Sequence, residues 1–201
     1  MRYFPIQNAA LRQWFSRTAR LGAVLALAAL ATAGARAQSL EEAGRRLIET
    51  HGNAIVTVRA VVVMGVDPSS DQDVVLEAAC PVVSPKGLTV VPLSVIDPAH
   101  QLKRFAGVQY AMMMQNVSSR PREIKIIVGR NEELDAEIVL RDADLDVAVL
   151  RPKQAPDKPM AAIDLKQAAQ PKVLERILTL SRLGKVAGRE NNIVSGEIQA
   201  V

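Results

Sequence analysis

The segment GLTVVPLSVIDP, from Gly87 to Pro98, sets the hydroxyl of Ser94 among apolar neighbours just before a turn. This serine fits three roles: a nucleophile, a polar residue at the end of a strand, or the replacement of a residue that once did chemistry there. A hydroxyl has a pKa far above 7, so a serine nucleophile needs a general base beside it. A carboxylate in a comparable setting is Asp146, which opens DVAVL, although an acid is also a common start for a strand.

The other residues with catalytic chemistry are two histidines and one cysteine. His51 precedes the first predicted strand and His100 lies six residues past Ser94, beyond the next turn, so we expect structural or solvated roles for both. Cys80 lies in VVLEAACPVV and is expected to be a buried, inert thiol. The adjacent methionines 112–114 would point to opposite faces of a strand, which favours core packing over a copper site. The sequence therefore predicts neither a metal nor a cofactor.

The first 37 residues have the pattern of a secretory signal. Arginines precede an apolar run from Leu21 to Ala33, and the segment ARA that ends at Ala37 offers the small residues that a signal peptidase accepts. The run has 13 residues, fewer than the roughly 20 that span a bilayer. We expect cleavage after Ala37, a periplasmic or secreted mature chain, and no membrane attachment after cleavage. An uncleaved membrane anchor is the alternative.

Removal of this segment changes the charge of the chain. The whole sequence has a net charge of +4, but residues 1–37 hold five arginines and no acids, so the remainder carries 20 basic and 21 acidic residues. A net charge near −1 without a basic stripe and interleaved aromatic residues argues against a nucleic-acid partner.

The remaining 164 residues are predicted to form an all-β domain with a short N-terminal helix. An amphipathic helix is expected over residues 38–53, where apolar residues share one face and Gly52 marks the end. Short apolar or alternating runs follow, broken by turn residues. They span residues 54–63, 74–83, 87–95, 123–129, 134–141, 145–151, 173–180 and 192–201. Residues 54–151 are therefore assigned to an antiparallel β-barrel, 152–170 to a proline-rich linker, and 171–201 to a partial second barrel with room for about three strands.

Three segments, in order, resemble the trypsin-like serine proteases of the Deg/HtrA group: CPVVSPKGLTVVPLSVID, IKIIVGRNEELDAEIVLRDADLDVAVLRP and VLERILTLSRLGKVAGRENNIVSGEIQAV. The resemblance covers residues 54–201. In that family, a Thr-Asn-x-His-Val-Val-type segment carries the catalytic histidine and an Asp-Leu-Ala-Val-Leu segment carries the catalytic aspartate. Counted from Gly87, the histidine position falls on Ser94, and Asp146 stands at the aspartate position. The resemblance implies a trypsin-like fold with the first barrel mostly complete and the second truncated.

The sequence departs from the family at the residues that do the chemistry. No Gly-x-Ser-Gly-Gly nucleophile loop occurs, and Ser195 lies in a strand motif. A hydroxyl at position 94 cannot act as general base, so Asp146 would orient no imidazole. The stretch from Ser94 to Asp146 is also longer than the family usually has, which we assign to an insertion at residues 101–121.

The resemblance therefore implies a pseudoprotease, a non-catalytic homologue that binds protein or extended-peptide partners and associates with itself through open strand edges. Two alternatives stay open. One is a serine endopeptidase whose site is completed by another chain or by His100 in an unusual geometry, and the other is a non-functional gene fragment. We further expect Ser94 and Asp146 to lie close together, with the Asp146 carboxylate accepting a hydrogen bond from Ser94 or from nearby backbone amides.

Overall fold

The computed structural model describes residues 40–105 and 116–200. The expected signal segment 1–37 and the methionines 112–114 lie outside these residues. No helix within the described ranges is both long and apolar enough to cross a membrane.

The expected N-terminal helix is present over residues 40–51, and a short 3-10 turn, Gly52–Ala54, follows it. By its contacts the chain divides into two compact units, Met1–Arg45 and Arg46–Val201. In the first unit, Glu41 and Arg45 form an exposed ion pair one helical turn apart. The second unit contains all the strands found in the described residues.

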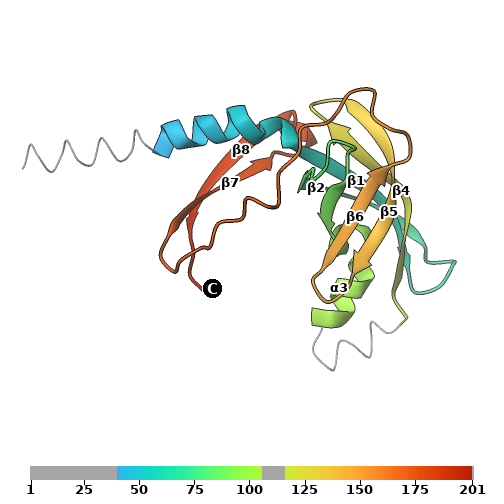
Figure 1. Ribbon diagram of the computed structural model, residues 1–201. Helices are drawn as coiled ribbons and strands as arrows, with labels where there is room; N and C mark the ends of the chain where they lie inside the picture. Colours follow the sequence, from blue (N-terminus) through green and yellow to red (C-terminus); the bar gives the residue numbers. More distant parts are fainter. Residues whose placement is uncertain (1–39, 106–115, 201) are drawn as a thin grey trace, which may run out of the picture. The chain divides into compact units, whose positions relative to one another are not determined.

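The second unit is mostly β-structure, as predicted (Figure 1). Six strands form one antiparallel sheet in the order β2-β1-β4-β5-β6-β3, and two more form a separate hairpin. The strands are β1 (Ile55–Gly65), β2 (Gln72–Pro81), β3 (Thr89–Pro92), β4 (Ser118–Val128), β5 (Glu132–Asp142), β6 (Val147–Pro152), β7 (Arg176–Arg182) and β8 (Asn191–Glu197). An isolated bridge between Val82 and Thr89 links the end of β2 to β3. With that bridge, the spatial order β4-β1-β2-β3 is that of a Greek key.

The six-stranded sheet curls into a half-barrel because β5 changes partner along its length. Residues 132–135 of β5 pair with β4, whereas its second half, from Ala136 to Asp142, pairs with β6. The register shifts between Ile138 and Leu140 on β5, and again between Val61 and Val62 on β1. Such irregularities bend a strand and increase its twist. The prediction of an antiparallel β-barrel is thus confirmed in its coarse form: the sheet is antiparallel and curled, and it forms a half-barrel.

The predicted strand over residues 87–95 is partly wrong. β3 ends at Pro92, and Leu93–Ile96 form a helical turn, α2, which is followed by helix α3 (Pro98–Phe105). The N–H of Leu93 makes the last bond in register with β6, to the carbonyl of Asp146. The run of β-forming residues is then interrupted because the N–H of Ser94 binds the Asp146 carboxylate instead of continuing the ladder. The N–H of Asp97 then closes the turn on the carbonyl of Leu93.

The half-barrel encloses one apolar core. On β1 the alternation of side chains turns Val56 and Val58 inward, and both are fully buried. The buried cluster draws on all six strands of this sheet and on α2: Val56, Val58, Cys80, Val82, Val91, Leu93, Ile96, Ile124, Ile126, Ala136, Ala148 and Leu150. This core fixes the ends of β3 and β6, which carry the candidate site.

The β7–β8 hairpin is attached to the half-barrel by an arginine. Arg182, at the end of β7, donates hydrogen bonds to the carbonyls of Gly52, Ile55, Gly129 and Arg189. Burial lowers the pKa of its guanidinium, while the charge of Glu190 opposes that shift. Where the sequence leaves room for about three strands, the structure has two.

Candidate functional site

The ends of two neighbouring strands bring Ser94 and Asp146 together. Pro92, the last residue of β3, pairs with Val147, the first residue of β6. The pairing continues for one more bond, since the N–H of Leu93 donates to the carbonyl of Asp146 at 2.9 Å. Ser94 follows Leu93 and Asp146 precedes Val147, so the two residues lie at facing strand ends, as the sequence predicts.

The Asp146 carboxylate accepts two hydrogen bonds from Ser94. Oδ1 accepts the backbone N–H at 3.0 Å, and Oδ2 accepts the Oγ hydroxyl at 3.2 Å. Both residues are half-buried. A partly buried carboxylate without partners is costly, and these two donors remove much of that cost. The expected hydrogen bond between Ser94 and Asp146 is thus confirmed.

The turn that presents Asp146 is held by further hydrogen bonds within the turn. Asp146 has φ of 53°, a left-handed conformation that aspartate and asparagine adopt more readily than most residues. The carboxylate of Asp142 accepts the N–H groups of Asp144 and Leu145 at 3.1 and 3.0 Å. The D-x-D spacing after a strand is the signal that indicates such a turn.

Helix α3 supports the same turn from the other side. Arg104 donates from Nη1 to the carbonyl of Ala143 at 2.6 Å and to that of Asp144 at 3.0 Å. The other end of α3 is fixed to β4, because Ser119 accepts the N–H of Ala99 at 3.0 Å and donates to the carboxylate of Asp97. Residues 98–105, which partly overlap the predicted insertion at 101–121, and residues 118–119 within it thus brace the site.

Neither histidine completes a triad in the described part of the chain. The hydrogen bonds of the Asp146 carboxylate there are the two from Ser94. The backbone N–H of His100 donates to the carbonyl and the carboxylate of Asp97, and its Nε2 is buried without a hydrogen-bond partner among the described residues. His51 ends the N-terminal helix. Asp146 and Ser94 thus hold a turn, and in the described part of the chain no imidazole is hydrogen-bonded to this carboxylate as it is in a triad.

Two further residues considered as nucleophiles, Cys80 and Ser195, lie in structural positions. Cys80 is fully buried in the core, and burial raises the pKa of its thiol to about 12, so it is poorly suited to act as a nucleophile. Ser195 lies exposed on β8, where it pairs with Leu178 of β7. Within the residues that the structure describes, no group of three histidine, cysteine or acidic side chains is placed to hold a metal ion.

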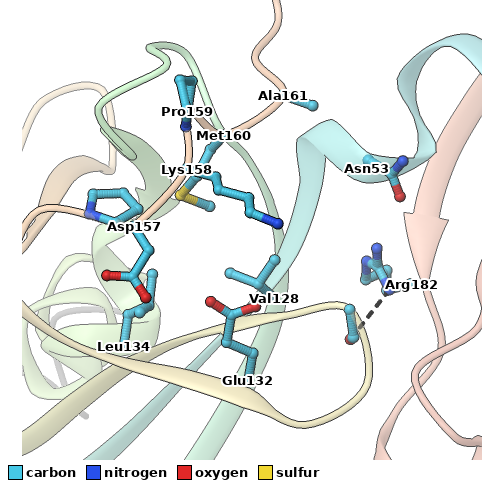
Figure 2. A pocket seen from close by; sticks show the side chains of 12 residues that line it. Asn53, Val128, Glu132, Leu134, Asp157, Lys158, Pro159, Met160, Ala161 and Arg182 are labelled. Atoms are coloured by element: carbon cyan, nitrogen blue, oxygen red, sulfur yellow. Dashed lines mark hydrogen bonds between the residues drawn. The ribbon is translucent and has the colours of Figure 1, made fainter.

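A cavity of about 450 Å³ lies elsewhere, beside Arg182 (Figure 2). Val128 and Leu134 form part of one wall, and Pro159 and Met160 belong to the segment that crosses it. Charged groups from Glu132, Asp157, Lys158 and Arg182 also line the cavity. Nη1 of Arg182 donates a hydrogen bond to the carbonyl of Gly129 at 3.3 Å, so the guanidinium beside the cavity already has a backbone partner. Neither Ser94 nor Asp146 belongs to its lining.

Comparison of the chain with models of protein families and with curated proteins finds no match in either.

Proposed function

We propose that this chain is a non-catalytic homologue of trypsin-like serine proteases that binds extended peptides or protein partners outside the cytoplasm. The observation that carries the proposal is the pair of hydrogen bonds from Ser94 to the Asp146 carboxylate. In the register of the resemblance, these residues occupy the histidine and aspartate positions of a triad. The contact between them supports that register, and a serine at the histidine position leaves the pair without an imidazole to act as general base.

The antiparallel order of the strands supports the same proposal. The half-barrel has Greek-key order, and the two positions of interest stand at the ends of strands that pair directly, β3 and β6. In a triad the carboxylate must reach the imidazole, and paired strand ends can bring two side chains that close together. The 201 residues also contain no Gly-x-Ser-Gly-Gly segment.

The proposed activity of this fold is binding, and the unpaired strand edges support that proposal. In the described residues, β7 and β8 pair only with each other, and β2 pairs along its length only with β1. An unpaired edge offers a row of N–H and C=O groups to an extended chain. Val75 on β2 and Val194 on β8 are 60% and 52% exposed, so each edge also carries an apolar contact.

The test combines a cleavage assay with a binding assay on the full chain. Wild type and Ser94→His are incubated with casein, and both are passed over an immobilised library of random heptapeptides. We expect no cleavage by either protein, since Ser94→His restores a His-Asp pair without a nucleophile. We also expect a subset of the immobilised peptides to retain both proteins. Cleavage by wild type contradicts the absence of catalysis, and a library in which no peptide retains the protein contradicts the binding function.

A further inference from the structure

A groove of about 600 Å³ on the half-barrel is lined by apolar and charged residues, and we call its apolar lining the floor and its charged lining the rim. The floor consists mainly of proline: Pro85, Pro152, Pro156 and Pro159, together with Ala155. The ionisable residues that line it are Lys86, Glu137, Arg151 and Lys153. A concave, mostly apolar surface with a few polar groups is the usual form of a ligand site.

The charge of the rim is positive once its ion pair is taken into account. Arg151 on β6 donates two hydrogen bonds to Glu137 on β5, from Nε at 3.1 Å and from Nη2 at 2.5 Å, and this contact neutralises the only acid of the groove. Lys86 and Lys153 are both exposed, and no described acid pairs with either. The ammonium groups of Lys86 and Lys153, which lie on different elements, thus flank the apolar floor and can pair with anionic groups of a ligand.

The walls of the groove are fixed before any ligand arrives. The N–H of Met160 donates to the carbonyl of Pro85 at 3.0 Å, which ties the 156–160 segment to the turn between β2 and β3. Gly87 has φ of 86°, and a Cβ placed there would come within 2.7 Å of the Pro152 ring, so only glycine allows this approach. Because proline rings also fix the backbone, binding orders little of the protein.

We propose that this groove binds an extended acidic peptide in which Asp or Glu residues flank one large apolar side chain. The apolar side chain packs on the proline floor, and the flanking carboxylates pair with Lys86 and Lys153. The inference rests on the proposed function, since it gives the chemistry of a peptide partner. It places the contact on the groove beside β6, away from the strand edges, and so the two can fail separately.

The experiment measures fluorescence anisotropy of the full chain with a fluorescein-labelled peptide, Gly-Glu-Asp-Phe-Asp-Glu-Gly. Two matched peptides replace the phenylalanine by alanine or all four acids by lysine. We expect binding of the first peptide that weakens as salt rises, about tenfold weaker binding of the alanine peptide, and no measurable binding of the lysine peptide. Equal binding of the acidic and lysine peptides overturns the inference.

Protein variants locate the contact. Lys86→Glu with Lys153→Glu is expected to weaken binding of the acidic peptide about tenfold, since two pairs become repulsive. Lys185→Glu, a charge change in the exposed turn of the hairpin, is the matched control and leaves the affinity unchanged. Because Lys86 and Lys153 are exposed, thermal unfolding of the double variant matches that of the control.

The outcomes separate this inference from the proposed function. If the acidic peptide binds equally well to the double variant, or does not bind while the random library yields other peptides, the groove assignment is wrong and the binding function stands. If no peptide of either set is bound, both proposals are wrong. Salt-sensitive binding that the double variant loses and Lys185→Glu retains supports both.

Discussion

The half-barrel and the β7–β8 hairpin are stabilised in opposite ways. The half-barrel buries its apolar side chains in one cluster contributed by its strands and α2. The hairpin leaves Ile177 and Val194 37% and 52% exposed, and two arginines, Arg182 and Arg189, fix it to the sheet. A two-stranded hairpin is at best marginally stable by itself. The half-barrel therefore supplies its own stability, whereas the hairpin depends on polar contacts at one end.

This difference indicates which substitutions destabilise one region and leave the other intact. A core residue of the half-barrel affects the whole unit, because its neighbours belong to several strands. A residue that holds the hairpin affects only the attachment. The candidate site lies between these extremes, since Ser94 and Asp146 are half-buried at the edge of the core. The following substitutions test this order, from the largest expected effect to the smallest.

Ile126→Ala removes a fully buried side chain at the centre of the half-barrel core. We expect a loss of about 3–4 kcal/mol in the free energy of unfolding, because the cavity is lined by several strands. Urea unfolding monitored by circular dichroism measures it. Ile177→Ala on the partly exposed hairpin is the control and costs less than about 1 kcal/mol. Equal losses for the two variants contradict the contrast between the regions.

Arg182→Ala removes all four hydrogen bonds from its guanidinium to backbone carbonyls. We expect local opening of the hairpin to become easier by about 2–3 kcal/mol, since several buried carbonyls lose a charged donor. Amide hydrogen exchange then speeds up in residues 176–197 and stays slow in β1 and β4. Arg176→Ala in the same strand, where the side chain is exposed, is the control. Faster exchange throughout the half-barrel contradicts a confined effect.

Asp146→Ala removes the acceptor of both Ser94 hydrogen bonds and places alanine at a positive φ. We expect a loss of about 2 kcal/mol. Ser94→Ala removes one bond and costs about 1 kcal/mol. Asp146→Asn costs less than Asp146→Ala, because asparagine tolerates this φ and its amide can accept the Ser94 N–H and donate to Oγ. Thermal unfolding ranks the three variants, and an Asp146→Asn loss as large as that of Asp146→Ala contradicts the geometry.

The smallest effect concerns an exposed ion-pair network on the outer face of the sheet. A hydrogen bond from Lys125 holds the pKa of the Glu133 carboxyl below its ordinary value, and the charge of Arg59 lowers it further. This lowered pKa stabilises the fold above the ordinary carboxyl pKa, and the stabilisation is lost as the pH falls through the folded value. Glu133→Gln therefore loses less stability than wild type between about pH 6 and about pH 3. Glu132→Gln, its exposed neighbour, is the control, and identical acid sensitivity of Glu133→Gln and wild type contradicts the assignment.

The sequence predicts much of the fold because most strands coincide with apolar runs between turn residues. β1, β2, β5 and β6 lie within a few residues of the predicted runs. The extent of β4 was missed at its start, because Ser118–Arg122 is polar and pairs with β1 through an exposed part of the sheet. α2 was missed because its residues are good strand formers, and only the distant carboxylate of Asp146 turns them into a helical turn.

The contact between Ser94 and Asp146 was predictable from the sequence, but the contacts that hold the turn around them were not. The resemblance stated for the sequence leads to the expectation that Ser94 and Asp146 lie close together, and two hydrogen bonds join them. Arg104, which donates to the carbonyls of Ala143 and Asp144, gave no sequence signal, since an arginine on a short helix has many other uses. The proline groove was likewise hidden, because its floor draws on the β2–β3 turn and on a segment that periodicity describes only as a linker.

The most direct test of the central claim is covalent labelling of the full chain by a serine-directed fluorophosphonate, with the modified residue mapped by mass spectrometry. We expect no adduct on Ser94 or Ser195 in wild type and none in Ser94→His, because no hydrogen bond joins a histidine ring to a serine hydroxyl among the described residues. An adduct on either serine of the wild-type chain, abolished when that serine is changed to alanine, would contradict it.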